Sequence, residues 1–205
     1  MYHDKKQHTH LIINTMKKIF FLLFLEIIFL KTVNSQTFGN FTDTRDGKTY
    51  KTIKIGEQVW MAENLAFKTD TGCWVYDNDK SNVSKYGYLY NWETARKVCP
   101  VNWHLPSQAE FETLLDKYGG SKNWNHENFE ALIKGGTSGF SAVLAGWRNY
   151  GKKYVFIGNH SYFWSSSAHD TDYPWRLYLY GHFRRAGMGS NLKTMGFSVR
   201  CIQDN

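Results

Sequence analysis

The pattern of apolar and polar residues begins with one continuous hydrophobic run near the N-terminus. Residues 19–30 are apolar except for Glu26, and Lys17 and Lys18 precede them. A run of twelve is shorter than the ~20 apolar residues that cross a bilayer. A basic segment, a short apolar run and small residues before a cut are instead typical of a secretory leader. We therefore expect a cleavable leader over residues 1–35, with an uncleaved signal anchor as the alternative.

The leader pattern itself starts at Met16, because the first fifteen residues are polar and rich in histidine. We therefore expect Met16 to be the true start. No cysteine directly follows the apolar run, so a lipid anchor on an N-terminal cysteine is not expected. Residues 36–205 have the length of one ordinary domain, and we predict a single domain there.

Alternating positions dominate the first part of this domain. Residues 48–55 alternate as a strand does, and residues 58–61 continue after a Gly-Glu turn. This pattern predicts an antiparallel hairpin. Residues 36–44 are polar, and we expect a loose N-terminal lead there.

Helical periodicity follows in the middle of the domain. Ser107 and Glu110 have the spacing of a capping box, and a helical face follows, ending before Gly119: Phe111, Leu114, Leu115 and Tyr118. A shorter helix is expected over residues 93–97, stopped by Pro100. Glycine- and aromatic-rich short strands come later, at residues 154–157, 162–165, 175–180 and 196–202. Early helices and late strands favour an α+β fold over a parallel βαβ sheet.

Charge narrows the possible partners. The first 35 residues hold five lysines and two acidic residues, so the net charge of the rest is +4 rather than +7. The domain has no basic tract, and export also argues against nucleic acid as a partner. Once a leader is cleaved, no stable membrane insertion is expected.

Three cysteines are present, Cys73, Cys99 and Cys201, so at least one lacks a partner within the chain. An exported compartment permits a disulfide. A bridge between Cys99 and Cys201 would tie the middle of the domain to its C-terminus. The alternative is that no bridge forms. If the bridge forms, Cys73 is left as a free cysteine, and a buried thiol is the alternative for it.

Five segments in order carry a family resemblance: Asp-Gly-Lys-Thr-Tyr at 46–50, Ile-Gly-Glu-Gln-Val-Trp-Met-Ala-Glu-Asn-Leu at 55–65, Tyr-Gly-Tyr-Leu-Tyr-Asn-Trp at 86–92, Cys-Pro-Val-Asn-Trp-His-Leu-Pro-Ser at 99–107 and Gly-Phe-Ser-Val-Arg-Cys at 196–201. The chain resembles the Fibrobacter succinogenes major paralogous domain family over residues 43–203. That family is common in exported proteins of the Bacteroidetes and Fibrobacteres. Many members carry a second cysteine pair, at positions that here are Val75 and Val83.

The order of these elements is also similar to the C-type-lectin-like fold, which the formylglycine-generating enzymes share. This likeness implies two short helices, then short antiparallel strands and long glycine-rich loops. It also implies a Cys99–Cys201 bridge from the first helix to the last strand. Such an analogy concerns the fold and fixes no function.

Aromatic and arginine side chains in the glycine-rich half are the candidate ligand-binding residues. In lectin-like folds this region forms the long loops that carry ligands. Flat rings beside directed polar groups suit a glycan, although core packing is the alternative for each ring. The candidates are Trp147, Arg148, Tyr150, Trp175 and Arg176.

Metal and catalytic chemistry have weaker signals. Asp77 and Asp79 are candidate oxygen ligands for Ca²⁺, but they lack the following Gly and Glu of an EF-hand loop, and a solvated turn is the alternative. No other metal site and no other cofactor is expected. Ser165, His169 and Asp170 lie close in sequence, yet triad members usually converge from separate elements. We expect His104 to be a hydrogen-bonded histidine of the core rather than a catalytic residue.

These observations favour an exported binding or adhesion module that is secreted, periplasmic or on the cell surface. A glycan or a surface protein is the expected partner. Two alternatives stay open. One is a structural or protein-interaction domain without a small ligand, and the other is an enzyme related to the formylglycine-generating fold.

Overall fold

A computed structural model describes residues 16–18, 36–121 and 124–204. The chain separates into residues 1–35 and a compact unit over residues 36–205, which is the part described below. The apolar run of the expected leader lies outside the described residues. Within the described ranges, none of the helices has the length and apolarity needed to cross a membrane.

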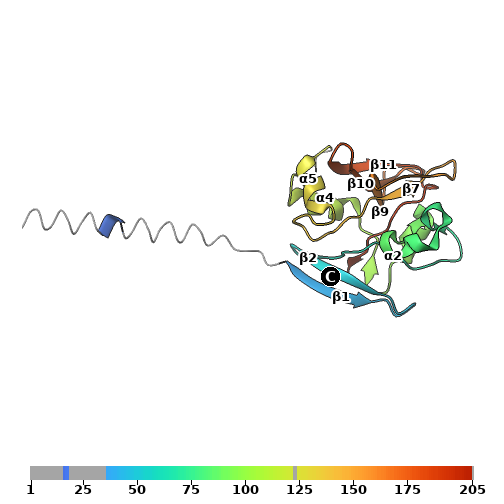
Figure 1. The fold of residues 1–205 in the computed structure, drawn as a ribbon, viewed down its shortest axis with the longest axis horizontal. Coiled ribbons are helices and arrows are strands. Elements are labelled where there is room, and N and C mark those ends of the chain that lie inside the picture. Colours follow the sequence, from blue (N-terminus) through green and yellow to red (C-terminus); the bar gives the residue numbers. More distant parts are fainter. Residues whose placement is uncertain (1–15, 19–35, 122–123, 205) are drawn as a thin grey trace, which may run out of the picture. The chain divides into compact units, whose positions relative to one another are not determined.

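The first sheet contains the predicted hairpin, which is confirmed. Strands β2 (Thr49–Ile55) and β3 (Gln58–Met61) pair antiparallel, with Ile55 opposite Gln58. The sheet has the order β1-β2-β3-β12-β6, and all its pairs are antiparallel. Figure 1 shows β1 and β2 side by side. The other members are β1 (Thr37–Thr42), β6 (Trp103–His104) and β12 (Ile202–Gln203).

The expectation of a loose lead over residues 36–44 was wrong. Residues 37–42 form β1, which pairs with β2 from Thr37↔Lys54 to Thr42↔Thr49. Most of its side chains are exposed because it is an edge strand. Backbone hydrogen bonds to β2 order this segment, and polar composition alone does not reveal them.

The second sheet has the order β11-β10-β9-β7-β8, and Figure 1 shows β10 and β11 near helices α4 and α5. The predicted strands at 154–157, 162–165 and 175–180 are confirmed within it. All its pairs are antiparallel except β7 with β9. Its strands are β7 (Ala145–Arg148), β8 (Tyr154–Ile157), β9 (His160–Ala168), β10 (Pro174–Tyr180) and β11 (Arg185–Ser190).

Both predicted helices form. They are α3 (Trp92–Val98) and α4 (Gln108–Asp116), and α4 has the full capping box: Ser107 Oγ accepts from the Glu110 amide at 3.2 Å, and the Glu110 carboxylate accepts from the Ser107 amide at 2.7 Å. The mixed α+β class is therefore confirmed. Smaller elements are β4 (Cys73–Trp74), η1 (Tyr76–Asn78), η2 (Lys80–Asn82), α2 (Val83–Tyr86) and β5 (Leu89–Tyr90).

A third helix, α5 (His126–Leu132), lies where only strands and loops were expected. Asn125 caps it by accepting from the Asn128 amide at 2.9 Å. Phe129 and Leu132, one turn apart, are both buried. Seven residues give too few turns for a clear periodicity, so packing rather than pattern identifies this helix.

The predicted last strand is only partly a strand. Of residues 196–202, Ile202 alone belongs to β12, although the whole segment is buried. Phe197 exchanges backbone hydrogen bonds with Tyr90, and Ser198 pairs with β9 through Tyr162 and Trp164. The carbonyl of Cys201 accepts from Met61 at the end of β3. The segment therefore passes between the sheets and bonds to several elements in turn.

The disulfide implied by the family resemblance is present. Cys99, the C-cap residue of α3, is bonded to Cys201, with a Cα–Cα distance of 5.9 Å and a sequence separation of 102 residues. Cys73 is half-buried, and its thiol exchanges hydrogen bonds with the backbone of Thr69. The bridge thus attaches α3 to the buried C-terminal segment.

Replacing Cys99 and Cys201 together by alanine is expected to lower the free energy of unfolding by about 2–5 kcal/mol, because the bridge closes a long loop in the unfolded chain. Urea unfolding of the oxidised protein measures this. Cys73→Ser, which keeps a donor and an acceptor near Thr69, is the matched control and should cost far less. Equal losses in both variants would contradict the assignment of the stabilising role to the bridge.

His104 joins the C-terminus to α4. Its Nδ1 lies 2.6 Å from Asp204 Oδ1, and its Nε2 lies 2.8 Å from Glu110 Oε1. Burial opposes protonation of the ring, but the hydrogen bonds to the two carboxylates outweigh it and raise the pKa of His104. With 41% of the side chain exposed, His104 is hydrogen-bonded as expected, but at the edge of the fold.

The raised pKa predicts a pH-dependent contribution to stability. The protonated ring stabilises the fold fully below the unfolded pKa of about 6.5, and this contribution is lost as pH rises through the higher folded pKa. His104→Gln should therefore cost more at about pH 6 than at about pH 8.5, by less than ~1 kcal/mol because the pair is partly exposed. Urea unfolding at both pH values measures the difference. Asp204→Asn should shrink the pH dependence, and an unchanged dependence would count against this account.

Candidate functional site

One face of the second sheet is covered by aromatic side chains. The antiparallel register sets His160 opposite Tyr180 and Tyr162 opposite Tyr178. Directly opposite residues project from the same face of a sheet. Alternate residues of these strands project to the other face and are fully buried in the apolar cluster that contains α4: Phe163, Leu177 and Leu179. The ring-bearing side of the strands is called here the aromatic face. Its central rings, Tyr162 and Tyr178, are only 5% exposed and belong to a second apolar cluster, so this face is accessible only at its edges.

Strands β7 and β8 extend the aromatic face. The ring of Trp147 lies 5.2 Å from that of Tyr162. Phe156 stacks on Trp147 at 6.4 Å and on His160 at 4.6 Å, and its side chain is 51% exposed. Gly146, with φ +65°, precedes Trp147, and a Cβ there would come 2.5 Å from the Tyr76 ring. Glycine at this position therefore lets β7 pack closely and present Trp147.

The other end of the aromatic face has an exposed rim. Trp124 lies 5.7 Å from both Tyr180 and Phe183, measured between ring centroids. More than half of the side-chain surface of Trp124 and of Phe183 is exposed. Tyr178 itself is only 5% exposed. Trp124 and Phe183 are therefore the accessible rings at this end.

Arg176 crosses the middle of the aromatic face. Its guanidinium carbon lies 4.1 Å from the ring centre of Tyr162 and 5.1 Å from that of Tyr178. The group donates to Asn191 and, at 3.4 Å, to the Tyr180 hydroxyl. Cation–π contacts and these bonds hold a buried positive charge against the rings.

Burial and the positive charge of Arg176 shift the pKa values of titratable groups on the aromatic face. Burial, together with the nearby His182 and Arg176, lowers the pKa of His160. Burial raises the pKa of Tyr162 despite Arg176. At neutral pH the imidazole is therefore neutral and the phenol is protonated, so both can donate and accept hydrogen bonds.

Three polar atoms on the aromatic face are buried and have no hydrogen-bond partner among the described residues: Trp147 Nε1, His160 Nδ1 and Arg176 Nη1. All three side chains lie round the Tyr162 ring. Buried polar atoms in native proteins usually have a partner. The aromatic face therefore combines flat rings with unused hydrogen-bonding capacity.

The structure brings together two of the five predicted ligand-binding residues. Trp147 and Arg176 both contact Tyr162 on the aromatic face. Arg148 instead stacks over Trp74 at 4.1 Å. Trp175 packs against His169 and the apolar cluster of α4, and Tyr150 lies in the β7–β8 turn with 75% of its surface exposed.

Sequence reasoning did not single out the rings that complete the aromatic face, which are His160, Tyr162, Tyr178 and Tyr180. The strands that carry them were predicted, however, and their alternation placed Tyr178 and Tyr180 on one side of β10. The missing signal was the register between β9 and β10, because only the pairing of the two strands sets their rings side by side.

Asp77 and Asp79 lie on the exposed η1–η2 turns. The carboxylate of Asp79 accepts from the Ser81 amide at 2.9 Å, which lowers the pKa of Asp79. Asp77 has φ 55° within η1. Among the described residues, no group of three or more His, Cys, Asp or Glu side chains is placed to hold a metal ion.

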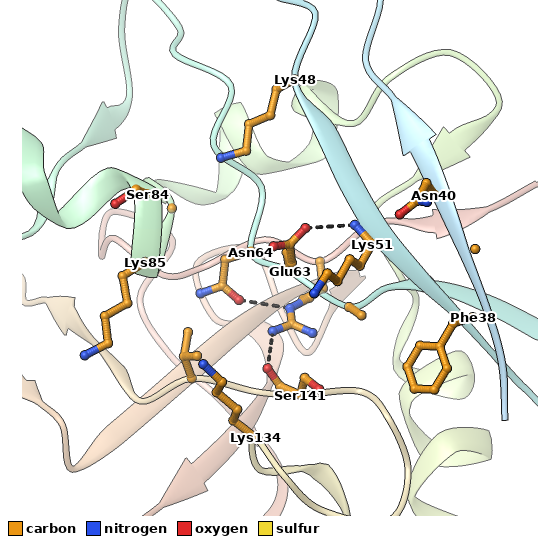
Figure 2. A pocket seen from close by; sticks show the side chains of 15 residues that line it. Phe38, Asn40, Lys48, Lys51, Glu63, Asn64, Ser84, Lys85, Lys134 and Ser141 are labelled. Carbon is orange, nitrogen blue, oxygen red and sulfur yellow. Dashed lines mark hydrogen bonds between the residues drawn. The ribbon is translucent and has the colours of Figure 1, made fainter.

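A separate pocket of about 720 Å³ opens between the first sheet and the loops beside it. Figure 2 shows four lysines entering it from different segments: Lys48, Lys51, Lys85 and Lys134. Arg200 also lines it, and Glu63 is its one carboxylate. None of its lining residues belongs to the aromatic face.

Comparisons with known proteins identify the family. Neither a search of curated proteins nor a search of solved structures gave a match. A family profile does match, that of the Fibrobacter succinogenes major domain, over residues 53–203. These residues include β3 and the end of β2, both disulfide cysteines and every strand of the aromatic face. The chain therefore belongs to the Fibrobacter succinogenes major domain family.

Proposed function

We propose that this protein is an exported, non-catalytic binding module whose aromatic face binds a glycan. The observation that carries the proposal is the set of exposed rings at the edges of the aromatic face, since Phe156 is 51% exposed and Trp124 and Phe183 are 54% and 56% exposed. Behind them, round the buried Tyr162, three buried polar atoms have no partner among the described residues. Sugar rings have apolar faces that stack on aromatic rings, and their hydroxyls pair with fixed donors and acceptors.

The arrangement suits a neutral or weakly polar sugar better than an anion. The charge of Arg176 is already partly met by two rings and two hydrogen bonds. Arg185, opposite Tyr180 on β11, is the other arginine on this side of the strands and lies at its edge. The neutral His160 ring and the Tyr180 hydroxyl add uncharged groups. Stacking and neutral hydrogen bonding would therefore supply most of the affinity.

We also propose that the α+β fold is C-type-lectin-like. In support, α3 is tied by a disulfide to the buried terminal segment, and the capped helix α4 and then an antiparallel sheet follow α3. This likeness places the aromatic face in the half of the chain that carries ligands in such folds. An enzyme related to the formylglycine-generating enzymes is the alternative. That relationship concerns the fold only and does not assign an activity.

Export rests on the leader pattern and on the disulfide, which oxidising compartments favour. If the leader is cleaved after Ser35, the mature protein begins at Gln36. Expression of residues 16–205 in a bacterial host, followed by intact mass measurement, should give a product of residues 36–205 outside the cytoplasm. A cytoplasmic product of unchanged mass would contradict export.

For the aromatic face, Phe156→Ala and Phe183→Ala are each expected to weaken glycan binding by about two- to tenfold, because each removes one ring worth ~0.5–1.5 kcal/mol. Both side chains are more than half exposed, so the fold should survive. A glycan array identifies the ligand, and titration calorimetry measures the affinities.

Tyr173→Ala is the matched control, because Tyr173 is an exposed ring (44%) at the start of β10, away from the rim. It should bind as the unaltered protein does. A silent array, or equal affinity in all three variants, would contradict the glycan proposal. A silent array together with capture of a surface protein that depends on Phe156 and Phe183 would favour the alternative protein-interaction role.

A further inference from the structure

The lysine-lined pocket beside the first sheet is the second site with unexplained chemistry. Its lysines come from separate parts of the chain: Lys48 and Lys51 lie at the start of β2, Lys85 lies in α2, and Lys134 follows α5. Four cations brought together by folding repel one another unless an anion compensates them. Glu63 is the one carboxylate among the lining residues.

Some basic residues elsewhere in the described part of the chain have a carboxylate partner, which the pocket lysines lack, although other exposed lysines such as Lys97 also have none. Arg45, Lys54, Arg96, Arg184 and Lys193 each form an ion pair with an aspartate or glutamate. No such pair within the described residues involves the four pocket lysines. The nearest charge interactions are with ring faces, since Lys48 lies over Tyr50 at 5.3 Å and Lys85 over Tyr86 at 4.8 Å.

Glu63 compensates little of this charge. Its carboxylate accepts from the backbone amide of Lys51 at 2.8 Å, rather than from a lysine ammonium group. Figure 2 shows this bond at the upper side of the pocket, with the lysine side chains around it. The five cationic side chains therefore leave the pocket strongly positive.

The buried side chain of Arg200 adds to the positive electrostatic potential of the pocket. Arg200 is fully buried, and its guanidinium donates only to neutral oxygens, namely Asn64 Oδ1 at 2.9 Å and the carbonyls of Met61, Phe140 and Ser141. Burial without a carboxylate partner lowers the pKa of Arg200 to about 9, although Glu63 opposes the change. A charge in such surroundings is weakly screened and acts across the pocket.

We propose that this pocket binds an acidic saccharide, whose carboxylate or sulfate group lies among the four lysines. The volume of about 720 Å³ exceeds what a single inorganic anion needs and falls in the range of small-molecule sites. Asn40, Ser84 and Ser141 line the pocket and can pair with sugar hydroxyls, while Phe38 and Val143 supply apolar contact. This site is separate from the aromatic face and stands or falls independently of it.

The test is titration calorimetry of the purified protein with a digalacturonate, a sulfated heparin-type disaccharide, cellobiose and inorganic phosphate. At least one acidic disaccharide should bind more than about tenfold tighter than neutral cellobiose. Whichever of the two acidic disaccharides binds more tightly shows whether carboxylate or sulfate is the preferred group. Its affinity should fall between about 20 mM and about 200 mM salt, because screening weakens exposed charges.

Lys51→Gln and Lys134→Gln should each lower the affinity for the acidic disaccharide roughly fivefold, and the double variant should lower it by more than about tenfold. Both side chains are exposed, and thermal unfolding checks that the fold is kept. Lys97→Gln, an exposed lysine of α3 outside the pocket, is the matched control and should leave the affinity unchanged. Phe156→Ala should also leave it unchanged, which separates this site from the aromatic face.

Three results would overturn the proposal. The first is equal affinity for acidic and neutral disaccharides, or binding of neither. The second is binding of inorganic phosphate alone, which would mean an anion site without a saccharide. The third is unchanged affinity in the Lys51→Gln/Lys134→Gln double variant.

Discussion

The buried guanidinium of Arg200 is the constraint on which much of the structure depends. A charged group without solvent is costly unless its hydrogen bonds are met. Here carbonyl and amide oxygens meet them, from the end of β3 and from the loop after α5. The rings of Phe140 and Phe163 lie 4.6 Å and 5.5 Å from its carbon and add cation–π stabilisation. Because no carboxylate among the described residues accepts a hydrogen bond from this guanidinium, these segments must stay in place to keep its hydrogen bonds satisfied.

Asn64 extends this constraint to the surface. Its amide nitrogen donates to the carbonyl of Tyr86 at 2.9 Å and to the Ser198 hydroxyl at 3.2 Å, while its oxygen accepts from Arg200. One hydrogen-bonded series therefore runs from α2 through Asn64 and Arg200 to Ser141. The pocket lysines Lys85 and Lys134 lie on the segments at the ends of this series. Because these hydrogen bonds fix the backbone near Lys85 and Lys134, the two lysine side chains can line the same pocket.

Sequence patterns predicted the elements whose formation depends on interactions between neighbouring residues. The capping box at Ser107 and the alternation of β2 and β3 need only neighbouring residues, and both were found from sequence. The edge strand β1, the short helix α5 and the path of residues 196–202 depend on distant partners. Their polar, brief or buried sequences carry no periodic signal of their own. The candidate sites also depend on distant partners, because the aromatic face needs the β9–β10 register and the pocket is lined by segments far apart in the sequence.

The segment at 196–202 explains why two such different sites occur in one small domain. The sequence pattern predicted a strand there, but most of its residues do not join a sheet. Phe197 packs under the aromatic face, 4.9 Å from Tyr162 and 6.0 Å from Trp147. Three residues later, Arg200 lines the lysine pocket, and Cys201 is anchored to α3. The disulfide thus holds the strip that supports both sites, and a change within the strip would disturb both together. Only side chains at the outer edges, such as Phe156 on one site and Lys51 on the other, can separate the two binding activities.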